Sequence, residues 1–161
     1  MVIGVISDTH GLLRPELLPL LTGSDHILHL GDVGDPEILA KLAKIAPVTA
    51  IRGNIDCNSG PAGPCANLPE TELITLGGRD FYLLHDVNQL DLAPAAAGIA
   101  AVLYGHSHRP EIRQSRGILY FNPGSCGPRR FQLPVTCGRI TIDENGQLRA
   151  EILEIPITPN R

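Results

Sequence analysis

The sequence predicts an α/β fold in which two mixed β-sheets pack as a sandwich flanked by helices. The first half alternates apolar runs with amphipathic segments, as in a parallel β-α-β-α-β unit. The second half contains three glycine-marked hairpin signals, which are typical of antiparallel strands. The chain has 161 residues, of which 43% are hydrophobic and 19% are charged. These values favour an ordered core and one domain over residues 1–161.

The first half is expected to contribute three strands and two helices. Asp35 and Pro36 are suited to the N-cap and the first helical position, so a helix should begin there and extend to about Lys44. A shorter helix is expected over Arg14–Leu21. Continuous apolar runs are typical of strands buried on both faces, and three occur here: Val2–Ser7, His26–Leu30 and Val48–Ile51.

The second half follows a loop rich in Gly and Pro over residues 57–69. A helix is expected over Asn88–Ala97 and a buried strand over Ala100–Tyr104. Glycine-containing turns predict three hairpins, which pair residues 72–76 with 80–84, 112–114 with 118–121, and 135–142 with 147–155.

Charge and apolar patterning restrict the partners and the location. The net charge of −4 offers no general basic surface for nucleic acid, although it does not exclude a local basic patch. The apolar start is too short for a signal peptide or a membrane span, so we expect a soluble cytoplasmic protein with no membrane contact. The oligomeric state is left open, and a homo-oligomer is compatible with the sequence. Four cysteines without CxxC spacing are expected to be free thiols: Cys57, Cys65, Cys126 and Cys137.

Polar side chains follow five of the expected strands, at the edge where ligands bind in open α/β sheets. Carboxylate oxygens and imidazole nitrogens are ligands for Zn²⁺, Mn²⁺ and Fe ions, and an asparagine carbonyl adds a neutral oxygen ligand. Seven such groups are too many for one ion and suit two. The segments are Ser7-Asp8-Thr9-His10, Gly31-Asp32, Gly53-Asn54, Leu84-His85-Asp86 and Tyr104-Gly105-His106-Ser107-His108.

Taken singly, most of these residues have a plainer interpretation. Aspartate and asparagine favour turns and helix caps, and a lone histidine at a strand end is usually structural. His26 and His29, which lie within an expected strand, are interpreted as buried supporting residues and not as ligands. The pair His106 and His108 is the most specific signal, because Gly105 lets the backbone turn sharply after a buried strand.

Together and in this order, the motifs resemble those of the calcineurin-like metallophosphoesterase superfamily. The small size and the closing Asn122-Pro123-Gly124-Ser125 resemble its small bacterial and archaeal phosphodiesterase branch, which includes the eukaryotic retromer subunit of similar fold. The resemblance implies a four-layer α/β/β/α sandwich with two divalent transition-metal ions per chain. Manganese is the first expectation, and iron, zinc, nickel and cobalt are alternatives.

The resemblance also implies which residues form the site. Residues matching Asp8, His10, Asp32 and His108 hold one ion in the family, and those matching Asp32, Asn54, His85 and His106 hold the other. Of these, Asp32, Asn54 and His85 are also assigned to catalysis. Three arginines near the same loops are candidates to bind the substrate, although solvated surface positions would explain them equally: Arg109, Arg129 and Arg130.

Two departures from the family pattern affect proton transfer and substrate contacts. The third motif often carries a histidine that protonates the leaving group, and Ile55 stands at that position here. The family often has Gly-His after the residue matching His85, where this chain has Asp86-Val87. The expected function is still a phosphodiesterase in which a hydroxide between two metals attacks phosphorus in line. The alternatives are a protein-binding scaffold resembling the retromer subunit and, ranked lower, a nuclease.

Overall fold

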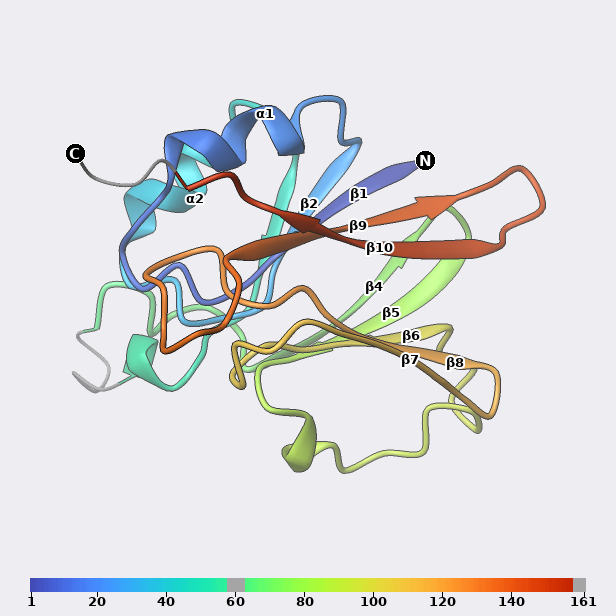
Figure 1. The fold of residues 1–161 in the computed structure, drawn as a ribbon. Helices are drawn as coiled ribbons and strands as arrows, with labels where there is room; N and C mark the ends of the chain where they lie inside the picture. Colours follow the sequence, from blue (N-terminus) through green and yellow to red (C-terminus); the bar gives the residue numbers. More distant parts are fainter. Residues whose placement is uncertain (58–62, 158–161) are drawn as a thin grey trace.

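Two five-stranded mixed sheets pack face to face in this computed structural model, which describes residues 1–57 and 63–157 (Figure 1). This arrangement confirms the predicted sandwich. Sheet A contains, in spatial order, β10 (Leu148–Glu154), β9 (Thr136–Ile142), β1 (Val2–Ile6), β2 (His26–His29) and β3 (Val48–Ala50). Sheet B contains β4 (Thr71–Leu76), β5 (Arg79–Leu84), β6 (Ala101–Leu103), β8 (Ile118–Asn122) and β7 (Glu111–Ser115).

The parallel unit predicted for the first half is confirmed. β2 pairs in parallel with β1 on one side and with β3 on the other. The connections carry η1 (Pro15–Leu17) with α1 (Leu18–Leu21), and α2 (Pro36–Leu42). α2 begins where the sequence indicates, because the Asp35 carboxylate accepts a hydrogen bond of 2.9 Å from the backbone N–H of Glu37.

The second half is only partly antiparallel, so that prediction needs correction. The three predicted hairpins, β4–β5, β7–β8 and β9–β10, are all present. However, β5, β6 and β8 pair in parallel at the centre of sheet B, and β9–β10 extends sheet A through an antiparallel pairing with β1. Parallel neighbours need long crossovers, and the segment between β5 and β6 is long enough to serve as one.

The helix predicted over Asn88–Ala97 is wrong. The segment forms η4 (Val87–Gln89), where the Asp86 carboxylate accepts a hydrogen bond from the backbone N–H of Asn88, and then a series of turns. Pro94 disfavours helical geometry at the residue before it, and Gly98 adopts a positive φ of 73°. The segment runs along the outer face of sheet B as an irregular chain (Figure 1).

The main core lies between the two sheets. Side chains that alternate along the strands meet there, including Ile3 and Val5 from β1 and Phe81 and Phe121 from sheet B, all fully buried. A second apolar cluster joins sheet A to α1 and α2. Within residues 1–57 and 63–157, no helix is both long and apolar enough to cross a membrane. The two cores fix the strands whose ends carry the site.

Candidate metal centre

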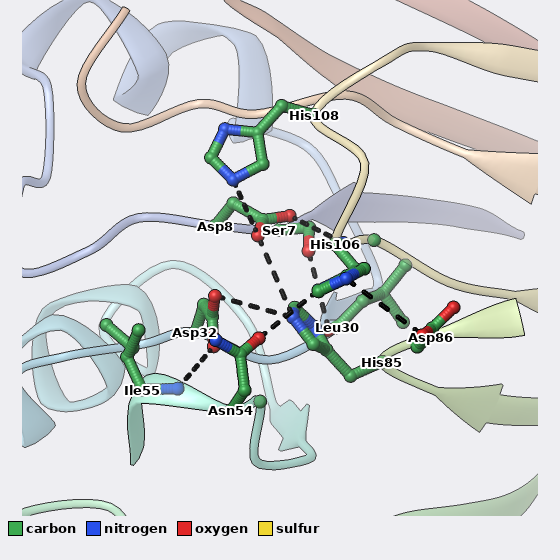
Figure 2. Close-up of polar contacts among 12 residues, drawn as sticks. Ser7, Asp8, Leu30, Asp32, Asn54, Ile55, His85, Asp86, His106 and His108 are labelled. Carbon is green, nitrogen blue, oxygen red and sulfur yellow. Dashed lines mark hydrogen bonds and ion pairs between the residues drawn. The ribbon is translucent and has the colours of Figure 1, made fainter. Parts of the chain in front are cut away.

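The seven predicted ligands follow the carboxyl ends of β1, β2, β3, β5 and β6, and their side chains converge at one edge of the sandwich (Figure 2, in which His10 is not labelled). The Asp8 carboxylate lies at the centre. Its Oδ1 is 3.7 Å from Nε2 of His10, 3.2 Å from Nε2 of His108 and 3.9 Å from Nε2 of His85. Residues almost a hundred positions apart in the sequence therefore meet around one buried carboxylate.

Asp32 lies between two of these histidines. Its Oδ2 is 3.6 Å from Nε2 of His10 and 3.4 Å from Nε2 of His85, and its Oδ1 accepts a 3.0 Å hydrogen bond from the backbone N–H of Ile55. A carboxylate at this point can face an ion on either side. The carboxylates and histidines form two compact sets, and within each set the ligand atoms all lie within 4.8 Å of one another. One set is Asp8, His10 and His108, the other is Asp8, Asp32 and His85, and Asp8 belongs to both.

Asn54 and His106 form the outer side of the cluster. Oδ1 of Asn54 lies 3.2 Å from Nδ1 of His106, and the His106 side chain is 46% exposed. The backbone N–H of His106 donates to Oδ2 of Asp8 at 3.2 Å. His106 belongs to neither of the two compact sets, so these two residues border the buried centre on its solvent side.

Five of the seven predicted ligands have left-handed backbone conformations. The φ angles are 58° at Asp8, 47° at His10, 54° at Asp32, 66° at His106 and 59° at His108. This region costs a residue with a Cβ atom about 1 kcal/mol or more. Such conformations cluster at functional sites, where the surrounding structure enforces them. Their coincidence with the predicted ligands supports a functional role for this edge.

Two glycines allow the loops to approach so closely. A Cβ atom at Gly53 would overlap the Asp32 carboxylate, and one at Gly105 would overlap the Ser7 hydroxyl and lie 2.7 Å from Oδ2 of Asp8. Because these positions lie beside the cluster, any side chain there would push the loops apart.

Asp56 holds two of the ligand loops together. Its buried carboxylate accepts hydrogen bonds from the backbone N–H groups of Val33 at 3.2 Å, Gly34 at 2.9 Å and Gly53 at 2.8 Å. These bonds join the loop that carries Asp32 to the loop that carries Asn54. The sequence reasoning did not assign this role, and its only signal was an acid two positions after Asn54.

The motif over residues 122–125 supports the remaining loops. The Asn122 side-chain amide donates to the Gly105 carbonyl at 2.9 Å and to Oγ of Ser107 at 3.1 Å. The Ser125 hydroxyl donates to the Asp8 carbonyl at 3.0 Å. The motif therefore fixes backbone around the ligands.

His29 is a buried supporting residue, as the sequence indicated. Its Nε2 lies 2.9 Å from Oγ1 of Thr9, and burial lowers the pKa of the imidazole to about 4. His26, at the start of β2, is only partly buried, and its Nε2 lies 2.9 Å from Oγ1 of Thr49.

Hydrogen bonding and charge prepare the cluster for a cation. Nδ1 of His85 lies 2.7 Å from the Leu30 carbonyl, and a proton donated there leaves Nε2 free as a ligand. Burial lowers the pKa of His85, but the Asp32 and Asp8 carboxylates and the Leu30 carbonyl together raise it to about 9. Burial also opposes ionisation of Asp8, but contacts with His10 and His108 hold its pKa well below the usual range.

The donor set fits divalent ions. Oδ1 of Asp8 and Nε2 of His85 are buried, and neither has a hydrogen-bond partner within the described part of the chain. Buried polar atoms are normally satisfied, so two such atoms facing one another indicate a missing partner. A cation coordinated by imidazole nitrogen and carboxylate oxygen would satisfy both.

The three candidate arginines are not equally placed. Arg109 lines a cavity of about 450 Å³ beside His106. Arg129 lines a cavity with Val135 and Ile155, and the described residues around that cavity include no predicted ligand. Arg130 is exposed. Another cavity, of about 630 Å³, borders Asn54, His85 and His106 and is lined by a different arginine, Arg52, which was not predicted from the sequence.

Comparison with known proteins agrees with the fold. The chain is 36% identical over 132 residues to a probable metallophosphoesterase of Methanothermobacter thermautotrophicus, covering 78% of this chain and 77% of that protein. An archaeal phosphodiesterase has a similar structure, with a TM-score of 0.74 and 22% identity over 95% of this chain and 100% of the other. Vps29 of Entamoeba histolytica, solved with zinc, gives a TM-score of 0.70 and 22% identity over 97% and 100%.

A family-level match covers most of the sequence. Residues 1–145 match the calcineurin-like phosphoesterase superfamily domain, and this span includes all seven predicted ligands. The chain therefore belongs to the calcineurin-like phosphoesterase superfamily.

Proposed function

We propose that the protein is a dinuclear metal-dependent phosphodiesterase. The observation that carries the proposal is the pair of ligand sets around Asp8 and Asp32, with two buried ligand atoms that lack partners in residues 1–57 and 63–157. We assign Asp8, His10, Asp32 and His108 to one ion, and Asp32, Asn54, His85 and His106 to the other. The whole chain, residues 1–161, is proposed to act as one domain.

Two divalent ions at these positions would supply Lewis acidity and lower the pKa of a bound water towards ~7. The protein contributes position and charge. Asp32 is fixed by the N–H of Ile55, and His85 is oriented by the Leu30 carbonyl. Because Asp8 and Asp32 are the only anionic ligands, the loaded site would keep a net charge of about +2 and attract a phosphate ester.

Two further features support parts of the proposal. The metallophosphoesterase relative and the fold shared with an archaeal phosphodiesterase favour a phosphate diester as the substrate. All four cysteines are free, as is usual in a reducing compartment, which favours the cytoplasm. We propose manganese as the metal, because imidazole and oxygen ligands accept it along with iron, zinc, nickel and cobalt.

The test combines metal content with turnover. The purified protein is loaded with Mn²⁺, freed of excess metal and analysed for bound ions, and its hydrolysis of bis(p-nitrophenyl) phosphate is measured. We expect about two ions per chain and metal-dependent release of nitrophenolate. A protein that binds neither Mn²⁺ nor the alternative metals would refute the proposal and favour a protein-binding scaffold, the alternative raised by the similarity to Vps29.

A further inference from the structure

One large cavity lies directly against the candidate metal centre. It has a volume of about 630 Å³, and Asn54, His85 and His106 form the part of its lining that adjoins the proposed ions. The side chain of His85 is 9% exposed, and its Nε2 has no hydrogen-bond partner in the described ranges. A phosphate bound at the centre would therefore place one of its ester substituents in this cavity.

Acidic side chains outnumber basic ones around the cavity. Among the described residues, its lining contains the carboxylates of Glu70, Asp86 and Asp91 and one guanidinium, that of Arg52. Arg52 is already engaged, because its Nη2 lies 3.4 Å from Oε2 of Glu70 and its Nη1 donates to the Ala66 carbonyl at 3.2 Å. Within the described part of the chain, the other two carboxylates, Asp86 and Asp91, form no ion pair with an arginine or lysine.

The two remaining carboxylates differ in their surroundings. Oδ1 of Asp86 accepts hydrogen bonds from the backbone N–H and the side-chain amide of Asn88, and its Oδ2 lies 4.0 Å from Nε2 of His106. Asp91 is exposed, and no hydrogen bond or ion pair in residues 1–57 and 63–157 involves it. Close to Asp86 and Asp91, away from the charge of the proposed ions, an anionic substituent would be repelled and a cationic one attracted.

An aromatic ring and an apolar side chain complete the cavity. Side chains alternate along β5, so Phe81 and Leu83 enter the core between the sheets while Tyr82 and Leu84 lie on the outer face. Tyr82 and Leu84 both line the cavity. A tyrosine ring attracts ammonium groups, and the attraction is strongest for cations that shed water readily.

We propose that this cavity selects phosphodiesters in which one substituent carries an ammonium group, such as a choline or ethanolamine ester. The inference rests on the proposed function, which places the phosphate at the metal centre. The carboxylates of Asp86 and Asp91 supply the charge preference, and Tyr82 supplies an aromatic contact. A second phosphate group on the substrate is disfavoured in this cavity.

The test compares two diesters that differ only in charge. p-Nitrophenyl phosphorylcholine and p-nitrophenyl 3,3-dimethylbutyl phosphate share a leaving group, and the second replaces the quaternary nitrogen by carbon. We expect kcat/KM to be about tenfold higher for the choline ester, from one cation–π contact and partly screened carboxylates. Asp91→Asn should reduce this ratio to about threefold. Glu144→Gln removes the same charge from the exposed β9–β10 turn and should leave the ratio at its original value.

The outcomes separate the inference from the proposed function. Hydrolysis of both diesters with a ratio near one overturns the cavity assignment and leaves the phosphodiesterase in place. If the protein hydrolyses neither of these diesters nor bis(p-nitrophenyl) phosphate, the proposed phosphodiesterase activity is refuted. In that case, calorimetric titration of the metal-treated protein with phosphorylcholine and with 3,3-dimethylbutyl phosphate tests the charge preference of the cavity without turnover. A tenfold affinity difference supports the inference, and equal affinities overturn it.

Discussion

Asp56→Asn provides a sharp test of how the ligand loops are held. In the native protein Oδ2 of Asp56 accepts from Val33 and Gly53, and Oδ1 accepts from Gly34. Asparagine has almost the same shape but only one acceptor oxygen, and its NH₂ group is a donor. In the better orientation the oxygen retains two of the three bonds, and the NH₂ group is forced against the N–H of Gly34.

The magnitude follows from these contacts. A hydrogen bond to a charged group contributes ~1.5–3 kcal/mol, and a buried donor left without a partner costs ~1–3 kcal/mol. The two retained bonds also lose the charge on their acceptor. We therefore expect Asp56→Asn to lower the free energy of unfolding of the metal-free protein by about 3 kcal/mol. At ~2–4 °C per kcal/mol for a chain of this size, Tm should fall by ~6–12 °C.

Asp35→Asn is the matched control. It makes the same chemical change, but Asp35 is a helix N-cap that accepts one bond from Glu37, and asparagine caps helices equally well. Its free energy of unfolding should change by less than about 0.5 kcal/mol. Urea unfolding measures both variants, and titration with Mn²⁺ should show ~10–100-fold weaker binding only for Asp56→Asn. An Asp56→Asn protein as stable as Asp35→Asn, with normal metal affinity, would refute the reasoning.

Three further predictions concern the metal centre. Asp32→Asn should abolish diester turnover and weaken both metal sites in calorimetry, whereas Asn54→Ala should weaken mainly one site; near-normal activity in Asp32→Asn would contradict a bridging role. The raised His85 pKa stabilises the metal-free protein below pH 6.5, and this contribution is lost as the pH rises through about 9. Over that interval each ion bound at His85 displaces a proton, so metal affinity should rise up to tenfold per pH unit. Calorimetry checks this, because the measured heat of metal binding should depend on the buffer that takes up the proton. The Ile55 side chain cannot donate a proton, and it points away from His85 in Figure 2. Activated aryl diesters should therefore react ~10²–10⁴-fold faster than alkyl diesters, whose leaving groups need a proton. A rate that hardly depends on the pKa of the leaving group, with chemistry rate-limiting, would contradict this.

Local sequence signals predicted the strands and the ligand segments well, because each depends on neighbouring residues. The apolar runs before Asp8, Asp32 and His85 end where the structure places the strand ends. Their convergence could be anticipated because ligands collect at the carboxyl edge of parallel strands.

Other features could not be read from local patterns. The parallel pairing of β5, β6 and β8 and the transfer of β9–β10 to sheet A depend on contacts distant in sequence. A helix is predicted over Asn88–Ala97 despite Pro94, but in the structure the backbone restriction at this proline prevails. The role of Asp56 and the cavity around Tyr82 depend on which loops become neighbours, and residue types alone do not specify that.

The left-handed backbone at five of the predicted ligands has a consequence for the history of this sequence. Glycine at any one of these positions would relieve ~1 kcal/mol of backbone strain. Together the five residues therefore lower the free energy of unfolding by about 5 kcal/mol, which is comparable with the entire net stability of many domains. Random substitution under selection for folding alone would favour replacing them. The proposed role as metal ligands would explain why aspartate and histidine stand at these positions. If these side chains bind metal as proposed, the five positions should be among the first to change in a descendant that no longer uses it.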